Sequence, residues 1–178
     1  MATSVINLFL NITIISNYMN SLRFLHSVPP LTENRNLSIT ASIWGVHMAT
    51  TNKFVHSDYS YGENLAMSWY NPKDKNNGTS YVIDAINRWY SEYTNYNFRF
   101  PGYSTGQFTT GHFTQLVWKS SSEYGISAVY DNKKCVYVVM EYNPAGNDGA
   151  YLTNVFPVKL AFKKSPPLAR RVNSRLYI

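Results

Sequence analysis

Four side chains that can bind metal ions or transfer protons occur on separate segments of the chain: His56, Glu63, Glu92 and His112. Glu92 follows Trp89 by three residues on a predicted helix, so the two share a face that should be at least partly buried. A buried carboxylate needs a partner, and an imidazole can supply one. A neutral imidazole oriented by a carboxylate is also a good ligand for Zn²⁺. Convergence of these four groups would therefore create a metal or acid–base site.

The same positions also have structural interpretations. Two scattered histidines are more often satisfied structural residues than metal ligands, so spacing alone does not decide between these roles. Glu63 fits equally well as a carboxylate that holds a turn at 62–64 through backbone amides, and Asn64 is expected to brace that segment. Three tryptophans are expected in the core rather than around a cofactor: Trp44, Trp89 and Trp118.

Three amphipathic helices are predicted in the first half of the chain. Apolar residues recur at offsets of three and four from Ile12 to Leu25, which predicts a helix ending near His26. A second helix is expected to begin at Asn34 or Asn36 and to run to about residue 54. After a polar loop at 71–79, a third is expected to begin at residue 79 or 80 and to carry Glu92.

The pattern changes to short β-branched and aromatic runs from residue 113 onward. We expect strands in FTQLVW (113–118), GISAVY (125–130) and CVYVVMEY (135–142), and the last two should form a hairpin. Helices followed by an antiparallel sheet predict an α+β fold in which helices cover the faces of the sheet.

Length and charge indicate one ordered domain followed by a basic tail. The 178 residues fit a single domain, and the 44% hydrophobic and 15% charged content excludes disorder over most of the length. Residues 1–158 hold ten Lys or Arg and ten Asp or Glu, so the body is neutral and predicts no nucleic-acid partner. The net charge of +6 comes entirely from residues 159–178, to which any electrostatic partner should bind.

Cysteine content and the N-terminus bear on localisation. The single cysteine, Cys135, cannot form an intramolecular disulfide, which favours a reducing compartment. The N-terminal segment is apolar but has no basic residue before Arg23, so it is a poor signal peptide, and it is too short and polar to span a membrane. We expect a cytoplasmic protein, with extracellular export by an unrecognised route as the alternative.

Several motifs resemble the CAP superfamily, which comprises cysteine-rich secretory proteins, antigen 5 and pathogenesis-related 1 proteins. GHFTQLVWK (111–119) is similar to its first signature, EYNPAGN (141–147) to its second and GENL (62–65) to its third. Residues 20–31 resemble the first-helix pattern, with Ser27 where the family has glycine. RWYSE (88–92) and YNF (96–98) are most similar to the Golgi-associated plant pathogenesis-related type, which implies a peripheral location on Golgi or other membranes.

This resemblance implies a three-layer α-β-α sandwich over residues 12–158, preceded by an extension at 1–11 and followed by a basic tail at 159–178. It also implies a central cleft in which His56 and His112 bind a metal, usually zinc. Glu63 and Glu92 would hydrogen-bond and orient neighbouring groups there.

The resemblance favours a non-enzymatic module that binds a divalent cation together with lipids, sterols or an anionic membrane surface. One alternative is a hydrolase in which His56 or His112 is the general base for a serine and Glu63 or Glu92 orients the imidazole. The serines at 57, 68 and 91 lie in no recognisable nucleophile motif. A second alternative is a self-assembling scaffold, since residues 135–142 would be adhesive at an exposed sheet edge; a homodimer fits this alternative and also the binding module.

Overall fold

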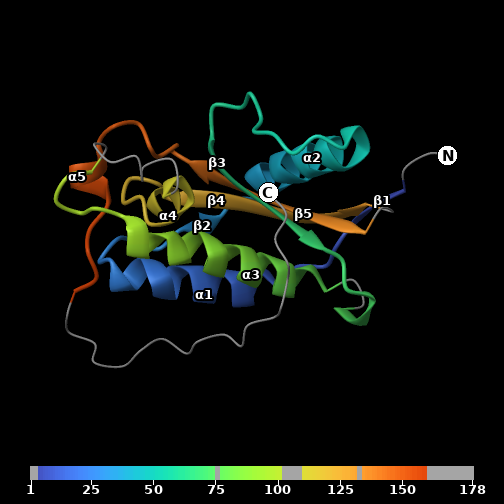
Figure 1. The fold of residues 1–178 in the computed structure, drawn as a ribbon, viewed down its shortest axis with the longest axis horizontal. Helices are drawn as coiled ribbons and strands as arrows, with labels where there is room; N and C mark the ends of the chain where they lie inside the picture. Colours follow the sequence, from blue (N-terminus) through green and yellow to red (C-terminus); the bar gives the residue numbers. More distant parts are fainter. Residues whose placement is uncertain (1–3, 75–76, 102–109, 132–133, 160–178) are drawn as a thin grey trace.

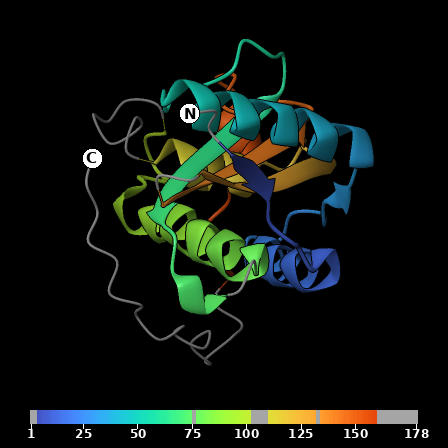
Figure 2. The ribbon, with the colours of Figure 1, turned by 90° about the vertical axis from the view of Figure 1, so that its right-hand side faces the viewer.

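The computed structural model describes residues 4–74, 77–101, 110–131 and 134–159, which form three layers around a central sheet. Helix α2 (Arg35–Thr51) lies on one face of the sheet, and helices α1 (Ile12–Leu25) and α3 (Gly78–Ser91) lie side by side on the other (Figures 1 and 2). The expected α+β class and α-β-α sandwich are therefore confirmed.

The sheet is built around the predicted hairpin. Strands β4 (Glu123–Asp131) and β5 (Cys135–Asn143) pair antiparallel, and β3 (Gly62–Trp69) pairs antiparallel with β5. The strand order is β1-β4-β5-β3, where β1 is Val5–Asn7, and the short β2 (Thr32–Glu33) adds to β4 in parallel. Strand β3 consequently lies at one edge of the sheet, next to β5.

All three long helices begin at an asparagine that caps the first turn. The side-chain oxygens of Asn11, Asn34 and Asn77 accept backbone N–H groups of Ile14, Asn36 and Thr79, respectively. These bonds satisfy donors that have no partner inside a helix. The predicted helices are thus confirmed to within a few residues at each end.

The remaining helical elements of the described residues are short. They are η1 (Pro72–Asp74), η2 (Glu92–Asn95), α4 (Gly111–Leu116) and α5 (Tyr151–Asn154).

Alternate residues of the strands supply two separate cores, because successive side chains of a strand point to opposite faces. The core beneath α1 and α3 includes Ile15, Met19, Ile86, Trp89, Ala66, Val138 and Met140. The core beneath α2 includes Ala41, Met48, Leu65, Val129, Tyr137 and Val139. Trp89 and Trp118 are buried as expected, whereas Trp44 is only partly buried and stacks on His47.

Two local predictions are wrong. Residues 113–118 were expected to form a strand, but residues 111–116 form helix α4. Both polar and apolar residues of this segment are buried, so its pattern carries no period that separates helix from strand. The expected turn at 62–64 is instead the start of β3, because these residues pair with 140–142 of β5, a partner far away in sequence.

The structure extends into both predicted flanking segments. Strand β1 and the buried Leu8 fall within residues 1–11, where no element was predicted. At the other end, the N–H of Lys159, the first residue of the predicted tail, donates to the oxygen of Leu25 in α1 at 3.3 Å. Just before it, Nδ1 of the buried His26 lies 2.6 Å from the carbonyl oxygen of Phe156. Residues 160–178 of the basic tail lie outside the described residues. Within the described part of the chain, no helix is long and apolar enough to cross a membrane.

Helix α1 ends at a serine in the left-handed conformation. Ser27 has φ of 58°; its N–H donates to the oxygen of Phe24 at 3.0 Å, and the N–H of Val28 donates to the oxygen of Arg23 at 3.3 Å. This pair of bonds is the Schellman motif, in which glycine is preferred because a Cβ is strained at positive φ. The serine that departs from the family pattern therefore occupies the position where glycine is physically favoured.

Replacing Ser27 with glycine should raise the free energy of unfolding by about 0.5–1 kcal/mol, the relief of left-handed strain less the entropy cost of glycine. Chemical denaturation measures the change. The matched control is Ser21→Gly on an exposed turn inside α1, which should destabilise the protein because glycine is a poor helix former. Equal destabilisation by both substitutions would contradict the expected strain at Ser27.

Candidate functional site

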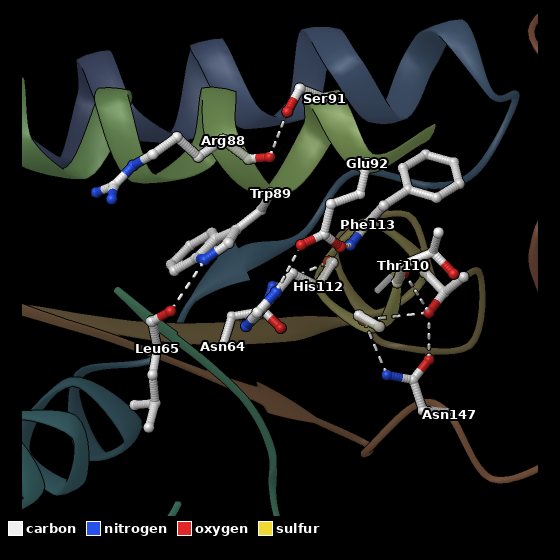
Figure 3. A network of polar contacts seen from close by, with 12 residues as sticks. Asn64, Leu65, Arg88, Trp89, Ser91, Glu92, Thr110, His112, Phe113 and Asn147 are labelled. Atoms are coloured by element: carbon white, nitrogen blue, oxygen red, sulfur yellow. Dashed lines mark hydrogen bonds and ion pairs between the residues drawn. The ribbon is translucent and has the colours of Figure 1, made fainter. Parts of the chain in front are cut away.

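The first predicted pair is His112 with Glu92. Nδ1 of His112 lies 2.7 Å from Oε1 of Glu92, and the N–H of Phe113 donates to Oε2 of the same carboxylate at 3.1 Å (Figure 3). Because a carboxylate only accepts, Nδ1 carries the proton in this bond, and in the neutral ring Nε2 is the nitrogen that keeps its lone pair. The expectation that Glu92 would find an imidazole partner is confirmed.

Elements from three parts of the chain position this pair. Glu92 follows the last residue of α3, and His112 is the second residue of α4. The ring of Trp89 stacks on the imidazole of His112 at a centroid distance of 6.0 Å, and its Nε1 donates to the oxygen of Leu65. Asn64 donates from Nδ2 to the oxygen of His112 at 3.0 Å (Figure 3). Asn64, which was expected to brace its own segment at 62–64, instead holds the backbone of His112 in α4.

The second pair is His56 with Glu63. Nδ1 of His56 lies 2.6 Å from Oε1 of Glu63, which also accepts the N–H of Ser57 at 3.0 Å. Glu63 thus has both roles that its sequence position suggested, as a backbone acceptor and as an imidazole partner. The side chain of His56 is 63% exposed, whereas that of Glu63 is 5% exposed. The hydrogen bond to Glu63 raises the pKa of His56 above its ordinary value, although burial opposes this effect.

The two pairs are linked through the start of β3, where Glu63 partners His56 and Asn64 holds the backbone of His112. Glu63 and Asn64 are adjacent residues, so both pairs are anchored at the start of this edge strand. Across the described ranges, no group of three or more His, Cys, Asp or Glu side chains could hold a metal ion. The four residues therefore form two carboxylate–imidazole pairs.

A third carboxylate beside Glu63 was not singled out from the sequence. Glu141 lies directly opposite Glu63 in the β3–β5 register and is fully buried. It lies where the predicted strand 135–142 meets the segment that resembles the second family signature. The signal that could have found it is a single charged residue within the apolar run CVYVVMEY.

Side-chain hydrogen bonds join the first and second signature segments behind His112. Thr114 donates from Oγ1 to Oδ1 of Asn147 at 2.6 Å, and Asn147 donates from Nδ2 to the oxygen of Gly111 (Figure 3). Oε1 of the buried Gln115 accepts the N–H of Gly146 at 2.8 Å. A Cβ at Gly62 would lie 2.2 Å from that same oxygen, so glycine is required where the third signature begins.

The serines considered as nucleophiles are engaged elsewhere. Oγ of Ser57 lies 3.4 Å from the N–H of Tyr59, Oγ of Ser68 accepts from Nη2 of Arg88, and Ser91 donates to the oxygen of Arg88. These contacts give no support to a serine–histidine pair.

Fold and motif positions together define a class of protein: the chain belongs to the Cysteine-rich secretory protein family, or CAP family, whose sequence profile matches residues 16–142. The chain is 37% identical over 147 residues to Golgi-associated plant pathogenesis-related protein 1 of Homo sapiens, which covers 79% of this chain and 88% of the relative. It is 35% identical over 149 residues to Protein PRY2 of Saccharomyces cerevisiae, covering 80% of this chain but 40% of that longer protein.

Solved structures share the same fold at lower sequence identity. BmVAL-1 superimposes with a TM-score of 0.60 at 19% identity over 76% of this chain and 77% of its own. NaASP2, crystallised with Zn²⁺, superimposes with a TM-score of 0.58 at 23% identity over 76% of this chain and 80% of its own. These similarities support the fold assignment.

Proposed function

We propose that the protein is a divalent-metal-binding module in which His56 and His112 each contribute Nε2 to one bound cation. The observation that carries this proposal is that both imidazoles are held in the same way. In each, Nδ1 lies 2.6–2.7 Å from a glutamate oxygen. Such a bond fixes the tautomer, orients the ring and raises the basicity of the other nitrogen.

The donor chemistry suits zinc or a similar borderline metal ion, which binds neutral imidazole well. The side chain of His112 is 36% exposed and that of His56 is 63% exposed, so solvent reaches both rings. With only two protein donors, the remaining positions of the ion would be taken by water or by a bound ligand. The presence of Zn²⁺ in a structural relative makes zinc the first ion to test.

A second proposed activity is weak binding to anionic membranes or lipids. A hollow of about 480 Å³ lies at the end of α1, and its lining combines apolar residues such as Phe24, Leu25 and Val28 with Lys119 and Lys159. An apolar surface beside two positive charges is complementary to an acyl chain that carries an anionic headgroup. Beyond Lys159, the five positive charges of residues 160–178 would add an electrostatic attraction of up to about 1 kcal/mol each near an anionic leaflet.

Deleting residues 159–178 should weaken binding to phosphatidylserine-containing liposomes at least about tenfold while leaving the fold intact. The deletion leaves ten positive and ten negative groups, so the net attraction disappears. Co-sedimentation at low and physiological salt measures the binding, and thermal melting tests the fold.

Neutral phosphatidylcholine liposomes are the control, and salt should weaken binding of the full chain by screening. Lys119→Glu in the full chain separates the hollow from the tail, because it changes the lining and leaves the tail charges in place. If the truncated protein binds anionic liposomes as well as the full chain, attachment is not electrostatic through the tail.

A further inference from the structure

The carboxyl group of Glu63, which binds His56, has a second carboxyl group, that of Glu141, beside it on the neighbouring strand. Glu63 on β3 and Glu141 on β5 are direct partners in the antiparallel register. Both belong to the face covered by α2, since Leu65 and Val139 of the same alternation pack in the core beneath that helix. Glu141 is completely buried, and the side chain of Glu63 is 5% exposed.

Three carboxyl oxygens of Glu63 and Glu141 accept no hydrogen bond from the described residues. Among the described residues, no hydrogen-bond partner reaches Oε2 of Glu63 or either oxygen of Glu141. Two ionised carboxylates in this position would be desolvated and would repel each other. A protonated carboxyl group, in contrast, has an O–H donor that a neighbouring carboxylate can accept.

In the described parts of the chain, the elements packed against Glu63 and Glu141 place no Lys or Arg beside them that would stabilise a second carboxylate. On β4 the residue opposite Glu141 is Gly125, which has no side chain, and a Cβ there would lie 2.1 Å from the carbonyl carbon of Leu37 in α2. The ionisable residues of α2 are Arg35 and His47, and both are exposed. His56 is bound to the other oxygen of Glu63.

We propose that Glu141 is a positioning residue that carries a proton at neutral pH and donates it to Oε2 of Glu63. Glu63 then remains the ionised member of the pair, and its Oε1 stays available to accept from His56 and from the N–H of Ser57. The proton on Glu141 does not require a bound metal. The further step, that this proton helps to orient His56 as a metal ligand, rests on the proposed function.

The raised pKa of Glu141 agrees with a protonated side chain at neutral pH. Burial, followed by the negative charge of Glu63, raises the pKa of Glu141 from 4.5 to about 8. Between these two values the native state holds one proton more than the unfolded state, so stability falls as pH rises through this window. The equilibrium constant for unfolding should increase by up to tenfold per pH unit from this group alone.

Glu141→Gln is the decisive variant, because its amide N–H₂ can donate to Glu63 as the protonated acid does. Its stability relative to wild type should rise steadily as pH is raised from about 4.5 to about 8. In infrared spectra at neutral pH, the carbonyl band of a protonated carboxyl group should be present in wild type and absent in this variant. The matched control is Glu123→Gln, since both Glu123 oxygens already accept from Asn34 and Asn143; it should keep the band.

The proposal is overturned if wild type lacks the protonated-carboxyl band, if Glu141→Gln retains it, or if the two proteins lose stability in parallel with pH. A zinc titration tests the consequence for His56 separately. Glu141→Gln should keep the wild-type affinity, whereas Glu141→Leu, which has no donor, should weaken it about 10–100-fold. Absence of zinc binding in wild type would refute the proposed function, while the infrared and stability results would still decide the proton on Glu141.

Discussion

Arg23→Ala should lower the free energy of unfolding by at least about 3 kcal/mol, the largest effect expected of any single substitution considered. Arg23 is completely buried in α1, and its guanidinium donates to four backbone oxygens. The acceptors are those of Pro29 at 2.8 Å, Leu116 at 2.9 Å, Trp118 at 3.0 Å and Ser121 at 3.2 Å. Alanine would leave these carbonyl groups without the donor and would open a cavity.

The geometry of the bonds explains why arginine is needed there. Its planar fork carries five N–H donors, and it keeps its charge even though burial lowers the pKa of Arg23 to about 10. Arg23→Lys should also be destabilising, because one ammonium group cannot span the four acceptors. Urea denaturation measures both variants against Arg35→Ala on an exposed turn of α2. A loss for Arg23→Ala no larger than for Arg35→Ala would show that the buried bonds contribute little.

The double variant His56→Ala/His112→Ala should lose more than about 100-fold in zinc affinity, because both imidazole donors are removed together. Calorimetric titration of zinc measures the affinity and the stoichiometry. If both rings bind one ion, wild type should take up one zinc per chain, and each single variant should lose most of the affinity. His47→Ala is the matched control, since His47 is exposed on α2 and stacks on Trp44 outside the site.

Zinc affinity should also fall as pH decreases, because protons compete with the metal for neutral imidazole. The hydrogen bond to Glu63 raises the pKa of His56 above its ordinary value of 6.5, so this competition should begin at a higher pH than for a free histidine. Equal zinc affinity at mildly acid and mildly alkaline pH would contradict histidine ligation. So would a double variant that binds zinc like wild type.

The site could be predicted only in part from the sequence, and Glu92 and Glu63 show where the limit lies. The partnership of Glu92 with an imidazole follows from a general requirement, since a carboxylate on a buried helix face must be paired. Which imidazole it meets depends on α4, a segment expected to be a strand. Glu141 escaped notice because its neighbour Glu63 is 78 residues away in the chain and becomes its neighbour only through strand pairing.

What the sequence determined by itself was local: the three long helices, the β4–β5 hairpin, the family motifs and the confinement of net charge to the tail. These features follow from periodicity, capping and turn chemistry between residues close in the chain. Tertiary structure alone decided that residues 111–116 are helical, that residues 62–64 begin an edge strand and that the four site residues form two pairs. Burial on all sides and long-range strand pairing select these outcomes, and neither leaves a periodic trace in the sequence.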